Sequence, residues 1–159
     1  MLDLRTQLQD CFRRGACLMG LGNVDYGDDG FGVRLAEDLA NADVPGVVVA
    51  GTTPHRSLGR ALERCPAHLI FADALEFGGV PGAAVFFDAA MITAKLPQVS
   101  THKISLGLLA KYAEADGKTK AWLLGVQPES LKPGQGLTPT VQVTLEILRE
   151  IIASSLKTL

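Results

Sequence analysis

The feature that most constrains this chain is a glycine-rich stretch between residues 20 and 32. It holds five glycines within thirteen residues, at Gly20, Gly22, Gly27, Gly30 and Gly32. Because glycine loses more backbone freedom on folding than any other residue, this density indicates positive φ angles or close backbone contacts. A short apolar run precedes the stretch, and apolar residues at helical spacing follow it. The pattern predicts a buried strand, a tight loop and then a helix.

This glycine loop differs from the common phosphate-binding loops. After Gly20-x-Gly22, a dinucleotide-binding fingerprint would place its third glycine at position 25, which is Asp25. A P-loop is excluded because no Gly-Lys-Ser/Thr sequence follows. Two adjacent carboxylates, Asp28 and Asp29, stand instead where the helix should begin, and they would repel a pyrophosphate there. We therefore expect the loop to present carboxylates, the simpler alternative being a tight turn with a capping aspartate.

Length and composition are those of an ordinary globular protein. The chain has 159 residues, 47% of them apolar and 20% charged, which predicts one domain over residues 1–159 with residues 1–15 as an N-terminal helical extension. A net charge of −2 provides no basic stripe for nucleic acid. The three cysteines form no CxxC pair and are expected to be reduced thiols in an intracellular protein. We expect no membrane span and no signal peptide.

Apolar runs alternate with helical patterns along the chain. Strands are predicted near residues 16–20, 47–50, 69–72, 83–87 and 121–124, and helices near 2–13, 31–41, 54–65, 104–115 and 139–156, with 91–100 irregular. The loop over residues 74–82 is too short for a crossover helix, so the strand after it should be antiparallel to the one before. This order predicts a three-layer α/β fold: a mostly parallel, five-stranded twisted sheet with one antiparallel strand and helices on both faces.

Polar side chains gather where these strands should end. Loops after three of the strands carry candidate ligands, at Asp28, Asp29, Asp73, Gln127 and Glu129. In open α/β sheets, ligands bind beyond the carboxyl ends of the strands. His102 lies in a further polar segment, just before a helix. Two carboxylates and an imidazole at one edge would form a metal site with open positions, although these ligand types do not by themselves name the metal.

The two adjacent aspartates are expected to differ in role. Successive residues at a helix start point in different directions, so both are not expected to face one ion. Asp28 suits an N-cap whose carboxylate accepts from the backbone N–H of Gly30 or Phe31, which leaves Asp29 for the metal.

Each candidate also has a structural alternative. Asp73 would hydrogen-bond within its loop, His102 would neighbour a helix N-cap, and Glu129 would be a solvated loop charge. Four more polar residues are expected to be structural: His55, His68, Asp25 and Asp88. The common hydrolase motifs HExxH and GxSxG are absent, and no cysteine stands beside a histidine.

Four motifs in this order resemble a known enzyme family. They are Gly20-x-Gly22-Asn23-x4-Asp28-Asp29-Gly30-x-Gly32, Asp73-Ala74 with Pro81-Gly82, Ser100-x-His102, and Gly125-Val126-Gln127-Pro128-Glu129. The set is similar to that of the hydrogenase maturation endopeptidases, small proteases that trim the large subunits of nickel–iron hydrogenases. The resemblance spans about residues 16–155 and leaves the role of the first helix open. The Asp-Asp pair looks most like the branch serving formate-hydrogenlyase-type hydrogenases.

The resemblance implies a function and a set of site residues. The fold would be similar to that of nucleoside phosphorylases, and the activity would be an aspartyl-type endopeptidase activity that removes a C-terminal peptide from a nickel-loaded precursor. The metal-contacting residues of the family fall on Asp29, Asp73 and His102. The nickel belongs to the substrate and signals that assembly is complete, and no organic cofactor is implied. We expect a cytoplasmic monomer with no nucleic-acid partner and no membrane insertion.

Two other functions stay open at this point. A nucleoside or small-molecule hydrolase on the same fold would need an arginine near the glycine loop, and Arg34 is the only candidate. Its helical spacing directs it toward solvent or neighbouring carboxylates instead. A non-enzymatic nickel-binding maturation factor would favour histidine-rich tracts, which three scattered histidines do not supply.

Overall fold

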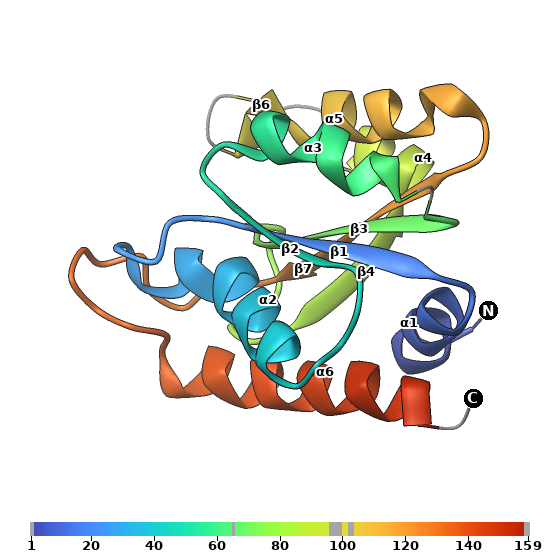
Figure 1. The fold of residues 1–159 in the computed structure, drawn as a ribbon. Coiled ribbons are helices and arrows are strands. Elements are labelled where there is room, and N and C mark those ends of the chain that lie inside the picture. Colours follow the sequence, from blue (N-terminus) through green and yellow to red (C-terminus); the bar gives the residue numbers. More distant parts are fainter. Residues whose placement is uncertain (1, 65, 96–99, 102–103, 158–159) are drawn as a thin grey trace.

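The computed structural model describes residues 2–64, 66–95, 100–101 and 104–157 (Figure 1). The elements follow the order α1 (Leu4–Arg13), β1 (Ala16–Leu21), η1 (Gly27–Gly30), α2 (Phe31–Asn41), β2 (Val47–Gly51), α3 (Pro54–Glu63), β3 (His68–Ala74), β4 (Ala84–Asp88), α4 (Ala89–Lys95), β5 (Ser100–Thr101), β6 (Ile104–Ser105), α5 (Leu106–Ala113), η2 (Glu114–Asp116), β7 (Lys120–Val126) and α6 (Pro139–Lys157). None of the described helices combines the length and the apolar character needed to cross a bilayer.

The main sheet of the described residues has five strands in the order β2-β1-β3-β7-β4. The first four strands are parallel, and β4 pairs antiparallel with β7. The predicted fold class and the reversed direction of β4 are thereby confirmed, although β4 lies beside β7 and is separated from β3. Strands β5 and β6 form a second, two-stranded antiparallel ladder.

Helices cover both faces of this sheet (Figure 1). Helices α1, α2 and α6 pack on one face, and α3, α4 and α5 pack on the other. The period of two along a strand divides the side chains between the two cores. In β1, Leu18 joins the core under α2 and α6, whereas Cys17 and Met19 join the opposite core. Such strands are buried on both faces, which explains their nearly continuous apolar sequences.

The topology places a switch point between β1 and β3. The chain leaves β1 through α2 on one face to reach the edge strand β2, and it returns through α3 on the other face to β3. The chain then leaves the carboxyl end of β3 toward β4, at the opposite edge of the sheet from β2, so the connections that leave the carboxyl ends of β1 and β3 diverge. A crevice at such a point is where open α/β sheets bind their ligands.

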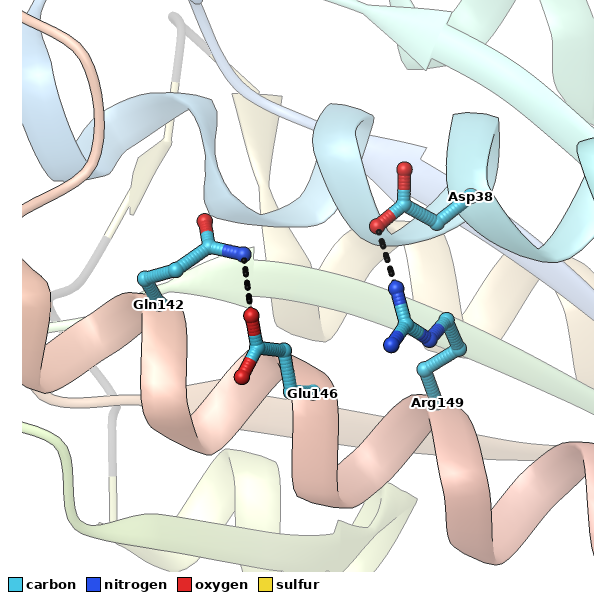
Figure 2. Close-up of polar contacts among 4 residues, drawn as sticks. All are labelled: Asp38, Gln142, Glu146 and Arg149. Atoms are coloured by element: carbon cyan, nitrogen blue, oxygen red, sulfur yellow. Dashed lines mark hydrogen bonds and ion pairs between the residues drawn. The ribbon is translucent and has the colours of Figure 1, made fainter.

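Apolar packing holds α6 against α2, with polar contacts at its margin. Figure 2 shows Arg149 of α6 reaching Asp38 of α2, with 3.3 Å between Nη1 and Oδ2. Gln142 and Glu146 pair along α6 itself, at 3.2 Å. Both partners of the ion pair are more than a third exposed, so it contributes at most about 1 kcal/mol. The buried apolar residues of α2 and α6 share one core and account for most of this contact.

The segment around residues 89–106 differs from the expected one. Residues 91–95 were expected to be irregular, but they belong to α4, where Ile92 is fully buried and the Asp88 carboxylate accepts from Met91 N at 2.9 Å. Helix α5 begins at residue 106, two residues later than predicted, because Ser105 is its N-cap. The Ser105 hydroxyl accepts from Leu108 N at 3.0 Å.

Two glycines allow α2 to approach the strands closely. A Cβ on Gly32, in the first turn of α2, would overlap the carbonyl oxygens of Ala72 and Leu21. A Cβ on Gly20 in β1 would overlap the carbonyl of Gly32 and lie 2.6 Å from the Ala36 Cβ. The close contacts inferred from glycine density are therefore present, and they fix the start of α2 directly on β1 and β3.

Replacing glycine in two helices should give opposite results. Gly32→Ala should lower the free energy of unfolding by about 1–3 kcal/mol, because the added methyl meets backbone atoms that cannot rotate away. Gly59→Ala in α3 has open space around its Cβ and should raise that free energy by roughly 0.5–1 kcal/mol. Urea unfolding of both variants and the parent measures this. Equal stability of the two variants would contradict the close packing of α2.

Candidate functional site

The candidate site lies at the carboxyl ends of β1 and β3. Asp29 is half-buried in the 3-10 turn η1, which follows β1. Asp73 is the penultimate residue of β3 and is fully buried, at 0% exposure, so it belongs to the strand and not to the following loop as expected. The two aspartates predicted as ligands thus stand on either side of the topological switch point.

Gly22 lies beside both of these residues. Its φ angle of +122° lies in a region that favours glycine. A Cβ at this position would overlap the Asp29 carbonyl and lie 3.5 Å from Oδ1 of Asp73. Gly22 therefore lies between the backbone of Asp29 and the carboxylate of Asp73, and its missing side chain lets both reach one place.

The carboxylate of Asp29 is oriented by its own loop. Its Oδ2 accepts a hydrogen bond from Asn23 N at 2.9 Å, so the side chain turns back across the glycine loop toward the end of β1. The backbone N–H of Asp29 donates to Tyr26 O at 3.1 Å. These bonds hold the residue within a compact loop between β1 and α2.

The predicted role of Asp28 as a helix cap is wrong. Its carboxylate is fully buried and accepts from Glu129 N, Ser130 N and both donors of Thr138, and no side-chain cap bond is made within η1 or at α2. Asp28 lies within a 3-10 turn, η1, that precedes α2, and its carboxylate bonds to the loop before α6.

Thr138, the residue before α6, contacts both the helix and Asp28. Its carbonyl accepts from Gln142 N and so begins the helix, but its hydroxyl donates to Asp28 at 2.9 Å. The sequence missed this contact because 110 residues separate the partners and no local pattern links them.

The third predicted ligand, His102, lies outside the described residues. Strands β5 and β6 stand on either side of it in the sequence. Among the residues that the structure does describe, no group of three His, Cys, Asp or Glu side chains could hold a metal ion. Asp29 and Asp73 are the predicted ligands whose positions are known, and the complete set remains a prediction.

The last loop contributes a residue whose role the sequence did not reveal. Gln127 is buried, at 4% exposure, and its Oε1 accepts from Phe77 N at 3.0 Å and Gly79 N at 3.1 Å. It thereby fastens the loop that follows Asp73. The side chain of Glu129 is exposed, as expected if it is a solvated loop charge. Its backbone N–H donates to the Asp28 carboxylate.

Arg34 does not provide an anion site beside the glycine loop. Its guanidinium is about half exposed and pairs with Glu37 one turn along α2, at 3.2 Å. This confirms the expected direction of the side chain. The arginine that a nucleoside hydrolase would need at this loop is therefore paired with Glu37.

Comparisons with known proteins identify the family. The model of the HycI hydrogenase maturation proteases matches residues 33–155, which is more than half of the chain. The chain belongs to the hydrogenase maturation protease family. It is accordingly a peptidase. The match begins just after the glycine loop, and the relatives below extend the similarity over more of the chain.

Two curated relatives and two solved structures illustrate the similarity. The hydrogenase 2 maturation protease of Escherichia coli K12 is 31% identical over 148 residues, covering 88% of this chain and 89% of the relative. The hydrogenase 3 maturation protease of the same strain is 32% identical, covering 70% and 72%. The HycI structure from Thermococcus kodakarensis superposes with a TM-score of 0.84 at 30% identity, covering 95% of this chain and 99% of that one. The Escherichia coli HybD structure gives 0.71 at 30%, covering 91% and 93%.

These relatives include proteases of both hydrogenase 2 and hydrogenase 3 at nearly equal identity. The family is therefore established, whereas the assignment to the formate-hydrogenlyase-type branch stays a prediction.

The described histidines lie away from the two aspartates or at the surface. His55 is exposed in the first turn of α3. His68 begins β3, at the opposite end of the strand from Asp73, and its Nδ1 accepts from Trp122 Nε1 at 3.0 Å. The structural role expected of His68 is confirmed by this bond. Burial lowers the pKa of His68, and the nearby charges of Lys120 and Arg14 lower it further.

Acidification should lower the stability of the fold because it protonates His68. Because the pKa of His68 is lower in the folded state, the unfolded chain binds the proton more readily. The stability that neutral His68 contributes is therefore complete above about pH 6.5 and is lost as the pH drops below that value. Melting temperatures between pH 7.5 and 5.5 measure the effect, with His68→Gln, which keeps an acceptor but does not titrate, as the reference. A wild-type loss no larger than that of His68→Gln would contradict the assignment.

Proposed function

We propose that this peptidase removes a C-terminal segment from the precursor of a nickel–iron hydrogenase large subunit. The observation that carries the proposal is that the Asp29 backbone and the Asp73 carboxylate both lie against Gly22, at the switch point of the sheet. Its relatives are named as maturation proteases of hydrogenases 2 and 3. The proposed partner is therefore a precursor of this kind, and we expect the protein to act on it as a cytoplasmic monomer.

Nickel enters this proposal as part of the substrate. Asp29 and Asp73 would contact the nickel that the precursor already carries, together with His102. Two carboxylates held near each other repel, and a divalent cation relieves that repulsion. An incomplete set of protein ligands also suits a metal that brings further ligands with it. Docking would then depend on a loaded precursor, which makes nickel the signal for cleavage.

The chemistry assigned to this chain is positioning, and the attacking group is water. No sequence motif provides a nucleophilic serine or cysteine. A metal ion can polarise the scissile carbonyl or lower the pKa of a bound water toward about 7. The backbone of the glycine loop and the end of β3 would hold the two carboxylates at fixed positions for that ion, because both belong to tightly packed segments.

Removing either carboxylate charge should abolish processing. Asp29→Asn and Asp73→Asn keep the side-chain size but lose the charge that a metal requires, so tail removal should fall by more than about 100-fold. Asp25→Asn is the matched control, because Asp25 is exposed in the same glycine loop and its loss removes the same charge. The measurement is the mass of a nickel-loaded precursor after incubation with each variant.

Melting curves of the three variants show whether each one is folded. Cleavage at the wild-type rate by folded Asp29→Asn or Asp73→Asn would contradict the assignment of these carboxylates to the metal.

Selectivity gives a second test of the proposal. A site that depends on the nickel of its substrate should leave nickel-free precursor uncut, and it should not digest casein. The same precursor, prepared with and without nickel and incubated side by side, gives the comparison. Equal cleavage of both forms would show that nickel is not the recognition element.

A further inference from the structure

The carboxylate of Asp28 in the glycine loop accepts hydrogen bonds from four donors. It is completely buried, yet all its partners lie in the loop between β7 and α6. Oδ2 accepts from Glu129 N at 2.9 Å and Ser130 N at 3.1 Å, and Oδ1 accepts from Thr138 N at 2.7 Å. The Thr138 hydroxyl adds a contact of 2.9 Å to Oδ2. One side chain thus joins Glu129, 101 residues later and near the start of this loop, to Thr138 at its end.

Backbone contacts complete the junction between these two loops. Asp28 N donates to Ser130 O at 2.9 Å, and Gly27 N donates to Gln135 O at 3.1 Å. In the other direction, Gly134 N donates to Asp25 O at 2.8 Å. Residues 25–28 and 129–138 therefore form one hydrogen-bonded unit, in which the Asp28 side chain is the buried centre.

The next residue in the chain is Asp29. Its carboxylate orientation depends on the same loop, because its Oδ2 bonds to Asn23 N at the loop's beginning. The junction holds residues 25–28, so it also limits how far the start of η1 can move relative to β1. A displacement of Asp28 would carry Asp29 with it and break the bond to Asn23.

We propose that Asp28 is the positioning residue of the site, which holds Asp29 in place by fastening the glycine loop to the loop between β7 and α6. This rests on the proposed function, since it gives Asp28 a part in the reaction without contact to the metal. A carboxylate suits the role because it offers only acceptors to four donors. An amide in its place would turn an N–H₂ group toward backbone N–H groups.

The decisive measurement follows individual backbone amides by hydrogen exchange in Asp28→Asn. The amides of Glu129, Ser130 and Thr138 should exchange faster, since they lose their acceptor. The Asn23 amide, which does not touch Asp28, should also exchange at least about 10-fold faster, because its acceptor on Asp29 moves. Amides in the centre of β3 should keep their exchange rates and show that the fold persists.

Three further variants set the scale. Asp25→Asn removes the same charge from the exposed part of the loop and should leave the Asn23 amide unchanged. Thr138→Val removes the hydroxyl donor and should release the same amides to a smaller extent, which keeps the proposal testable if Asp28→Asn does not fold. Thr138→Ser keeps the donor and should behave like wild type.

Processing of nickel-loaded precursor is measured beside exchange. Asp28→Asn should lower kcat by about 10–100-fold per folded molecule with little change in KM, as expected for a residue that orients a metal-contacting group. Faster exchange of the Glu129, Ser130 and Thr138 amides, with unchanged exchange at Asn23 and an unchanged kcat, would overturn the proposal. Asp28 would then have a purely structural role. If the wild-type protein cleaves no precursor but the Asn23 amide exchanges faster in Asp28→Asn, the proposed function fails and the positioning role stands.

Discussion

The close contact between α2 and the carboxyl ends of β1 and β3 is the constraint on which the site depends. Gly20 and Gly32 remove the side chains that would separate helix from strands, and Gly22 leaves room between Asp29 and Asp73. The tightest contact at each of these three glycines is to a backbone carbonyl oxygen, which cannot rotate away as a side chain could. The position of the site is therefore set by main-chain packing, and the carboxylates only complete it.

Buried polar side chains then fix the loops at this edge. The Asp28 carboxylate accepts hydrogen bonds from the loop before α6, and the Gln127 side chain accepts them from Phe77 and Gly79 in the loop after β3. A buried polar group is costly unless it is hydrogen-bonded, so each side chain tolerates few alternative loop positions. Loops that carry functional groups at a sheet edge are often mobile. Here the hydrogen bonds to Asp28 and Gln127 restrain the loops at this edge.

Much of the fold could be predicted because its signals are local. Apolar runs located the five strands of the main sheet to within two residues, and the short loop after β3 gave the direction of β4, whereas β5 and β6 were not predicted. Helix α4 was missed because its one turn of apolar signal, around Ile92, is too short to stand out. The start of α5 was misplaced because Ser105 acts as a cap only when its own backbone is extended, as it is here.

The sequence alone determined the order of the five main strands and of five helices, the glycine loop and the family, and it named Asp29 and Asp73 as partners across the sheet edge. Those conclusions depend on neighbours in the chain or on motifs that keep their order. Only the tertiary structure decided what Asp28 does, because its donors lie 101 and more residues away. Two adjacent aspartates are chemically identical in a sequence. They differ here because burial directs one toward backbone donors of another loop and leaves the other beside Gly22.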